Sequence, residues 1–159
     1  MTTETQHVHD ENCNHNHDHE AVDHPFEKGL ALYEAKADYN EVIPLFEEGI
    51  TLTPKDSVGY TCLAWLLLLR NEGDDAQRAE KICMQGLRLD PGNYQAHFNL
   101  VLAMLHNKTK GVRQEFQQAM RKLQTQEDKE EVLTNLREAV SREPEFEAAA
   151  KMLNWIENP

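Results

Sequence analysis

The chain has 159 residues, of which 28 are acidic and 16 are basic, so its formal net charge is −12. A protein that mainly binds nucleic acid or an anionic membrane needs a basic face, and this balance argues against both roles. The sequence has no apolar run of about 18 residues for membrane insertion, no secretory signal and only three cysteines, so we expect a soluble cytoplasmic protein.

Residues 1–23 have the composition of a disordered tail, rich in Thr, Asn, Asp, Glu and His and nearly without large aliphatic side chains. Imidazole and thiolate groups bind Zn²⁺, Ni²⁺, Co²⁺ and Cu²⁺. The candidate ligands are His7, His9, Cys13, His15, His17 and His19. Their spacing matches no defined metal site, so a solvated tail that is merely rich in histidine is the alternative. We expect no required cofactor, and Zn²⁺ or Ni²⁺ on the tail is the hypothesis to test.

From residue 24 onward, apolar residues recur at intervals of three and four, which is the period of an amphipathic helix. The pattern predicts eight helices joined by short links, over residues 24–36, 39–52, 57–70, 75–89, 93–107, 111–125, 128–142 and 145–157. Strand signals are weak. We therefore predict an all-α fold in which neighbouring helices are antiparallel.

Two spacings of apolar and small residues repeat along these helices. The first combines two apolar residues, a small residue and a proline: Val42, Phe46, Gly49 and Pro54; Ala79, Cys83, Gly86 and Pro91; Val132, Leu136, Ala139 and Pro144. The second occupies the preceding helices: Phe26, Gly29, Leu30 and Tyr33; Tyr60, Leu63, Ala64 and Leu67; His97, Leu100, Val101 and Met104. The small residue in the first spacing lets a neighbouring helix approach closely.

These spacings resemble the tetratricopeptide repeat family, in which helix pairs recur about every 34 residues. The resemblance implies a right-handed α-solenoid of antiparallel helix pairs, with repeats over 24–56, 57–92 and 93–126. A C-terminal pair over 127–159 would then cap the stacking face that the last repeat otherwise exposes. The helix over 111–125 also fits the start of a fourth repeat, and three pairs with a cap is the arrangement that we favour.

The resemblance also implies a concave groove, lined by the first helix of each pair, that binds a partner peptide or helix. Mapped onto this chain, its lining residues are Glu27, Ala31, Glu34, Thr61, Trp65, Leu68, Gln95, Phe98, Asn99 and Leu102. Trp65 lies in an apolar run, so we favour burial in the core for it over a role as groove anchor. Chaperone-binding members of the family clamp a C-terminal carboxylate with Lys, Asn and Arg, and only Asn99 fits that set here.

We therefore predict a protein-interaction module, an adaptor or assembly factor whose partner is a protein or peptide. The alternative is a metal-handling protein whose tail stores or delivers an ion while the helices dock a client. Glycine-rich phosphate loops, nucleophile elbows and HExxH motifs are absent from the sequence, so we do not expect an enzyme. Cys62 and Cys83 occupy apolar repeat positions and are interpreted as small buried residues.

Overall fold

Residues 24–159, the part of the chain that this computed structural model describes, form eight α-helices and no strand. The helices are α1 (Pro25–Glu34), α2 (Tyr39–Leu52), α3 (Ser57–Arg70), α4 (Asp75–Leu89), α5 (Tyr94–Asn107), α6 (Val112–Lys122), α7 (Gln126–Arg142) and α8 (Glu147–Glu157). All eight lie where the apolar periodicity predicts them. The predicted disordered tail and its candidate metal ligands lie outside the described residues.

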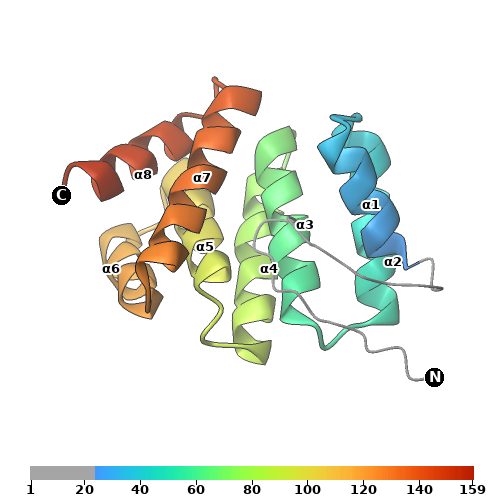
Figure 1. Ribbon diagram of the computed structural model, residues 1–159, viewed down its shortest axis with the longest axis horizontal. Helices are drawn as coiled ribbons and strands as arrows, with labels where there is room; N and C mark the ends of the chain where they lie inside the picture. Colours follow the sequence, from blue (N-terminus) through green and yellow to red (C-terminus); the bar gives the residue numbers. More distant parts are fainter. Residues whose placement is uncertain (1–23) are drawn as a thin grey trace.

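The first six helices form three antiparallel pairs that stack side by side: α1 with α2, α3 with α4, and α5 with α6 (Figure 1). The predicted all-α, tetratricopeptide-like fold of stacked helix pairs is confirmed for this part of the chain. Its helices turn the predicted stripes inward, and Val42, Phe46, Ala79 and Cys83 are completely buried.

Close approach between the first three helices depends on glycine. Phe26 of α1 stacks on Phe46 of α2, with the ring centroids 5.4 Å apart. A Cβ atom on Gly49 would lie only 2.1 Å from the Phe26 ring. The small residue in the predicted spacing therefore makes room for an aromatic ring from the neighbouring helix.

Short polar side chains begin most of the helices. The carboxylates of Asp38 and Asp56 accept hydrogen bonds from backbone N–H groups two residues further on, and the Asn93 side chain accepts one from the backbone N–H three residues on. Each bond satisfies an N–H group that has no partner inside its helix. These caps explain why α2, α3 and α5 begin within a residue of where the sequence predicts.

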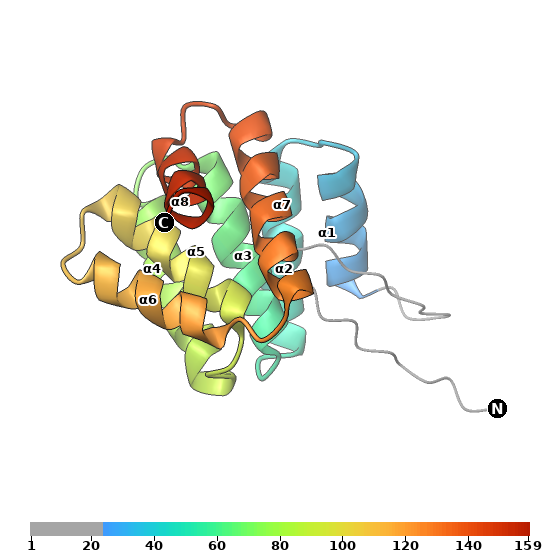
Figure 2. The ribbon, with the colours of Figure 1, turned by 60° about the vertical axis from the view of Figure 1, so that its left-hand side comes forward.

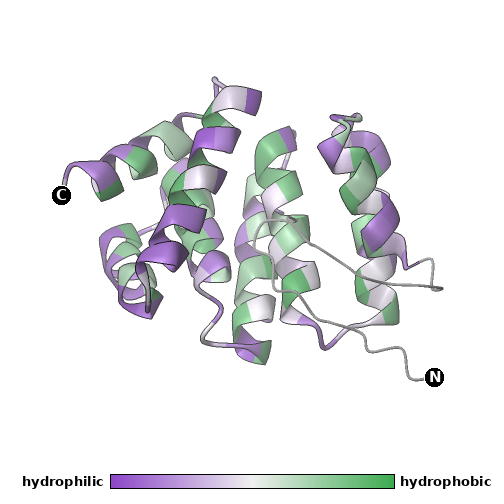
Figure 3. Ribbon diagram, viewed as in Figure 1, coloured by the Kyte–Doolittle hydropathy of each residue, from purple (hydrophilic) through white to green (hydrophobic). Residues whose placement is uncertain are grey.

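The last helix pair takes a path that differs from the predicted cap. α8 packs against the end of the stack, where the Trp155 ring lies 5.2 Å from the Phe116 ring of α6. α7 instead turns back across α5 and α3 and reaches α1, running between α1 and α8 in Figure 2. Its visible side is largely hydrophilic, whereas α3 is hydrophobic along most of its length (Figure 3).

Candidate functional site

The candidate site is the surface that α1, α3 and α5 present toward α7, which we define as the inner face. The middle helix, α3, packs against α4 on its outer side and lies under α7 on its inner side. Burial on both sides explains why residues 61–69 of this helix are all buried. A helix that is apolar nearly all round is typical of such a position.

Seven of the ten predicted groove residues are buried in this arrangement. They are Thr61, Trp65, Leu68, Gln95, Phe98, Asn99 and Leu102. Of the three predicted on α1, Glu27 is half-buried, and Ala31 and Glu34 are exposed. α8 packs on α5 beside Phe98 and Leu102, α7 is linked to Trp65 through Tyr33, and part of α1 is left open. Trp65 is 1% exposed, in agreement with the favoured prediction that it is buried in the core.

Tyr33 of α1 is the centre of the polar contacts with α7. Its hydroxyl accepts a 2.9 Å hydrogen bond from the indole N–H of Trp65 and donates to the Glu138 carboxylate. The Arg142 guanidinium lies 3.9 Å from the centre of the Tyr33 ring and donates to the Tyr33 carbonyl at 3.0 Å. Burial, followed by the hydrogen bond to Glu138, raises the pKa of Tyr33 well above its ordinary value. The hydroxyl therefore stays protonated and remains a donor.

Two further tyrosines donate to carboxylates near the two ends of α7. Tyr94 of α5 donates to Glu131 at 2.7 Å, and Tyr39 of α2 donates to Glu143 at 2.8 Å. Burial and the bond to Glu143 raise the pKa of Tyr39 to about 12, so this hydroxyl also stays protonated at neutral pH. Tyrosine hydroxyls from the stack thus meet carboxylates from Glu131 of α7 to its C-cap residue, Glu143.

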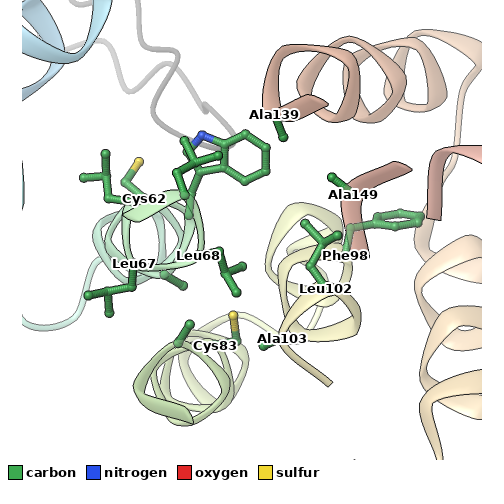
Figure 4. Close-up of a cluster of buried hydrophobic side chains, with 14 of the residues drawn as sticks. Cys62, Leu67, Leu68, Cys83, Phe98, Leu102, Ala103, Ala139 and Ala149 are labelled. Atoms are coloured by element: carbon green, nitrogen blue, oxygen red, sulfur yellow. The ribbon is translucent and has the colours of Figure 1, made fainter. Parts of the chain in front are cut away.

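The apolar side of α7 completes the contact. Leu136 and Ala139 are buried, and Ala139 is completely so. In Figure 4, Ala139 of α7 lies over the buried cluster, and Ala149 of α8 lies beside Phe98 and Leu102 of α5. The backbone of α7 packs closely against α8 and only sparsely against any other helix. α7 is therefore held on the inner face mainly by long side chains.

Asn99 and Gln95 of α5 are polar side chains that are buried in the stack, and Asn99 is bonded to α3. The Asn99 amide donates to the Thr61 carbonyl at 3.1 Å, and its carbonyl oxygen, Oδ1, has no hydrogen-bond partner among the described residues. Gln95 is buried beside it in the same helix. Buried polar groups are costly unless they are paired, so a hydrogen-bond donor that reached the Asn99 oxygen would be stabilising.

The three tyrosines are not among the groove residues that the sequence predicts. Tyr33 stands at a position of the packing stripe, and Tyr39 and Tyr94 open their helices, so spacing alone assigns their hydroxyls no partner. The two described cysteines, Cys62 and Cys83, are buried as predicted, and burial raises the pKa of Cys83. Within residues 24–159, no three His, Cys, Asp or Glu side chains are placed to hold a metal ion.

No protein-family model and no curated protein matches the chain. Solved structures do resemble it, among them three tetratricopeptide repeat domains. The Arabidopsis OM64 domain is 22% identical, with 82% of this chain and 88% of that one covered and a TM-score of 0.49. The second human RPAP3 domain, in complex with an HSP70 peptide, is 16% identical, with coverages of 86% and 94% and a TM-score of 0.48. The first domain of Spaghetti (RPAP3), bound to an HSP90 peptide, is 18% identical, with coverages of 82% and 88% and a TM-score of 0.46.

In the part of the chain that the structure describes, no helix has the length and apolar character needed to cross a membrane.

Proposed function

We propose that this chain is a protein-interaction module, an adaptor or assembly factor, whose inner face binds a helix or peptide of a partner protein. One observation carries the proposal: the inner face holds a helix, α7, through tyrosine hydroxyls that donate to its carboxylates rather than by close backbone packing. Tyrosine and tryptophan are enriched in protein interfaces because they combine a large apolar surface with a polar group.

The ligand that we propose is a helix rather than a chaperone C-terminal tail. HSP70 and HSP90 peptides are bound in two of the similar structures. In this chain, Glu27 and Ala31 stand at two of the positions where the resemblance places the Lys, Asn and Arg side chains that clamp a terminal carboxylate. A negative charge at such a position repels the ligand carboxylate. The same face accommodates a complete helix along its length, as α7 demonstrates.

Two further properties follow from the same proposal. We propose that the chain is not an enzyme, because the cysteines at its core are buried among apolar side chains and its tyrosine hydroxyls serve as docking contacts. We also propose a cytoplasmic location, which the acidic charge and the two free described thiols support.

Site-specific photo-cross-linking in the native cell tests the proposal. A photoreactive phenylalanine analogue replaces Ala31, which is exposed and is placed on the inner face by the repeat spacing. The matched control carries the analogue at Met84 of α4, which is 42% exposed on the outer side of the stack. We expect one partner segment, identified by mass spectrometry, to cross-link to position 31 and not to position 84. Cross-links from position 84 alone, or from neither position, would show that the inner face is not the binding surface.

A further inference from the structure

α7 has the features of a helix that forms without its neighbours. It is 17 residues long and begins with a capping box, in which Thr125 and Asp128 each bind the other's backbone N–H. Hydrogen bonds from the Gln124 and Thr125 backbone lower the pKa of Asp128, so the cap carries its negative charge at neutral pH. A Glu138–Arg142 pair, 3.2 Å apart, adds a contact across one turn. These local interactions remain when the helix leaves the inner face.

The connections around α7 allow it to move together with α8. Only residues 123–125 join it to α6, and residues 143–146 join it to α8. α8 is held at the end of the stack by Trp155, which packs on Phe116 and lies under the Arg113 guanidinium at 4.0 Å. The α7 backbone packs closely only against α8, and α8 also packs closely against α5. The two helices therefore form one unit that is docked at the end of the stack through α8 and on the inner face through the side chains of α7.

The inner face sets requirements that any occupant in place of α7 must satisfy. The hydroxyls of Tyr33, Tyr39 and Tyr94 need acceptors. Trp65 needs apolar cover, because it is only 1% exposed when α7 is in place. Phe98 is covered instead by Phe116 of α6 and by α8, where Ala149 lies beside it. An uncovered face would expose large aromatic side chains next to unpaired polar groups, which costs free energy. The face is therefore stable when a helix of matching pattern covers it.

We infer that the α7–α8 pair is an exchangeable internal cover of the inner face and that the partner presents a helix that copies the side-chain pattern of α7. This inference rests on the proposed function and specifies its ligand. The pattern has carboxylates at positions i and i+7, as in Glu131 and Glu138, with Leu at i+5 and Ala at i+8, as in Leu136 and Ala139. Positions seven apart lie on one face of a helix. A partner helix with this pattern meets Tyr94 and Tyr33 with its carboxylates and covers Trp65 with its apolar residues.

A fluorescent peptide with the sequence of residues 124–144 tests the inference in the full-length chain. Ala139→Glu places a charge at a completely buried position of the internal cover, so it should release α7 and free the inner face. The matched control is Thr134→Glu, which adds the same side chain at an exposed position of the same helix. We expect fluorescence anisotropy to show at least tenfold tighter peptide binding to Ala139→Glu than to the wild type or to Thr134→Glu. A peptide that itself carries Leu136→Asp should not bind.

The outcomes separate the inference from the proposed function. Equal peptide binding to all three proteins, or none to any, would contradict an exchangeable cover, and so would loss of the α1–α6 helices in Ala139→Glu, measured by circular dichroism. A partner cross-linked from position 31 would still support the proposed function in each of those cases. Without that cross-link, tighter binding of the peptide to Ala139→Glu would establish the exchangeable cover while the proposed function fails.

Discussion

The indole N–H of Trp65 donates a 2.9 Å hydrogen bond to the hydroxyl of Tyr33, which stands in a different helix pair. The Tyr33 hydroxyl in turn donates a hydrogen bond to the Glu138 carboxylate of α7. A buried aromatic residue of the middle pair, a tyrosine of the first pair and a carboxylate of the returning helix therefore form one connected unit. Without α7, the Tyr33 hydroxyl would lose its acceptor, Glu138, so this part of the inner face depends on the presence of α7.

Tyr33→Phe removes the hydroxyl that joins these groups. The variant leaves the Trp65 indole N–H and the Glu138 carboxylate without their shared partner, so we expect a loss of about 1–2 kcal/mol in the free energy of unfolding. Urea denaturation measures this loss. Tyr60→Phe is the matched control, since its hydroxyl donates to the Pro54 carbonyl at an exposed site and should change little. Equal effects of the two variants would show that the buried connection is not stabilising.

Gly49→Ala tests the close approach of the first helices. The added Cβ would lie 2.1 Å from the Phe26 ring, which is stacked and buried. We expect a destabilisation of about 2 kcal/mol, because overpacking a filled core displaces its neighbours. Gly86 is at the matching position of the second repeat, and a Cβ added there would lie 3.3 Å from its nearest atom. Gly86→Ala should change the free energy of unfolding by no more than about 0.5 kcal/mol, since Ala also favours the helix. Thermal unfolding compares the two, and a smaller loss for Gly49→Ala would contradict this packing.

Asp75 makes the stability of the second pair depend on pH. The Arg70 guanidinium donates two hydrogen bonds of 2.8 Å to this buried carboxylate, and the Glu72 backbone N–H adds a third of 3.0 Å. Burial alone would raise the pKa of Asp75, yet these bonds lower it below its ordinary value of 3.8. Its contribution to stability is therefore complete above that value and is lost as the pH falls through the lowered pKa.

Asp75→Asn should cost about 2 kcal/mol at pH 7, because a charged, bidentate pair with arginine is lost. The difference in free energy of unfolding between the wild type and the variant should become smaller below pH 4. Urea denaturation at a series of pH values measures it. A difference that stays constant from pH 7 to pH 3 would show that the carboxylate charge is not responsible.

The histidine-rich tail remains a prediction from the sequence alone. Zn²⁺ or Ni²⁺ should bind the full chain through the imidazole and thiolate groups of residues 7–19 and should leave it on chelation. A chain that begins at His24 is the control, and isothermal titration calorimetry measures both. Equal uptake by the two chains would end the metal hypothesis.

The sequence predicts the helices and their buried stripes well because these are local properties. The Val42, Phe46 and Gly49 stripe and the caps at Asp38 and Asp56 are found where they are expected. The sequence does not predict the path of α7. An apolar stripe such as that of Leu136 and Ala139 shows that one side of a helix is buried, but it does not tell which surface covers it.

The end of α6 and the start of α7 are set by hydrogen bonds that the apolar periodicity of the sequence does not reveal. α6 ends at Lys122 rather than near residue 125, and the next backbone N–H groups, of Gln124 and Thr125, bind Asp128 instead. α7 consequently begins at Gln126, before its first apolar residue. A short polar link therefore replaces the last turn of the predicted helix and directs α7 back toward the inner face.

Hydrogen exchange of the native full-length chain, followed by mass spectrometry, tests the central claim most directly, because it detects helices that leave the stack without global unfolding. We expect α7 and α8 to exchange together and at least about tenfold faster than α3 and α5. Exchange of α7 at the same rate as α3, through global unfolding alone, would contradict the claim that the inner face has an exchangeable cover.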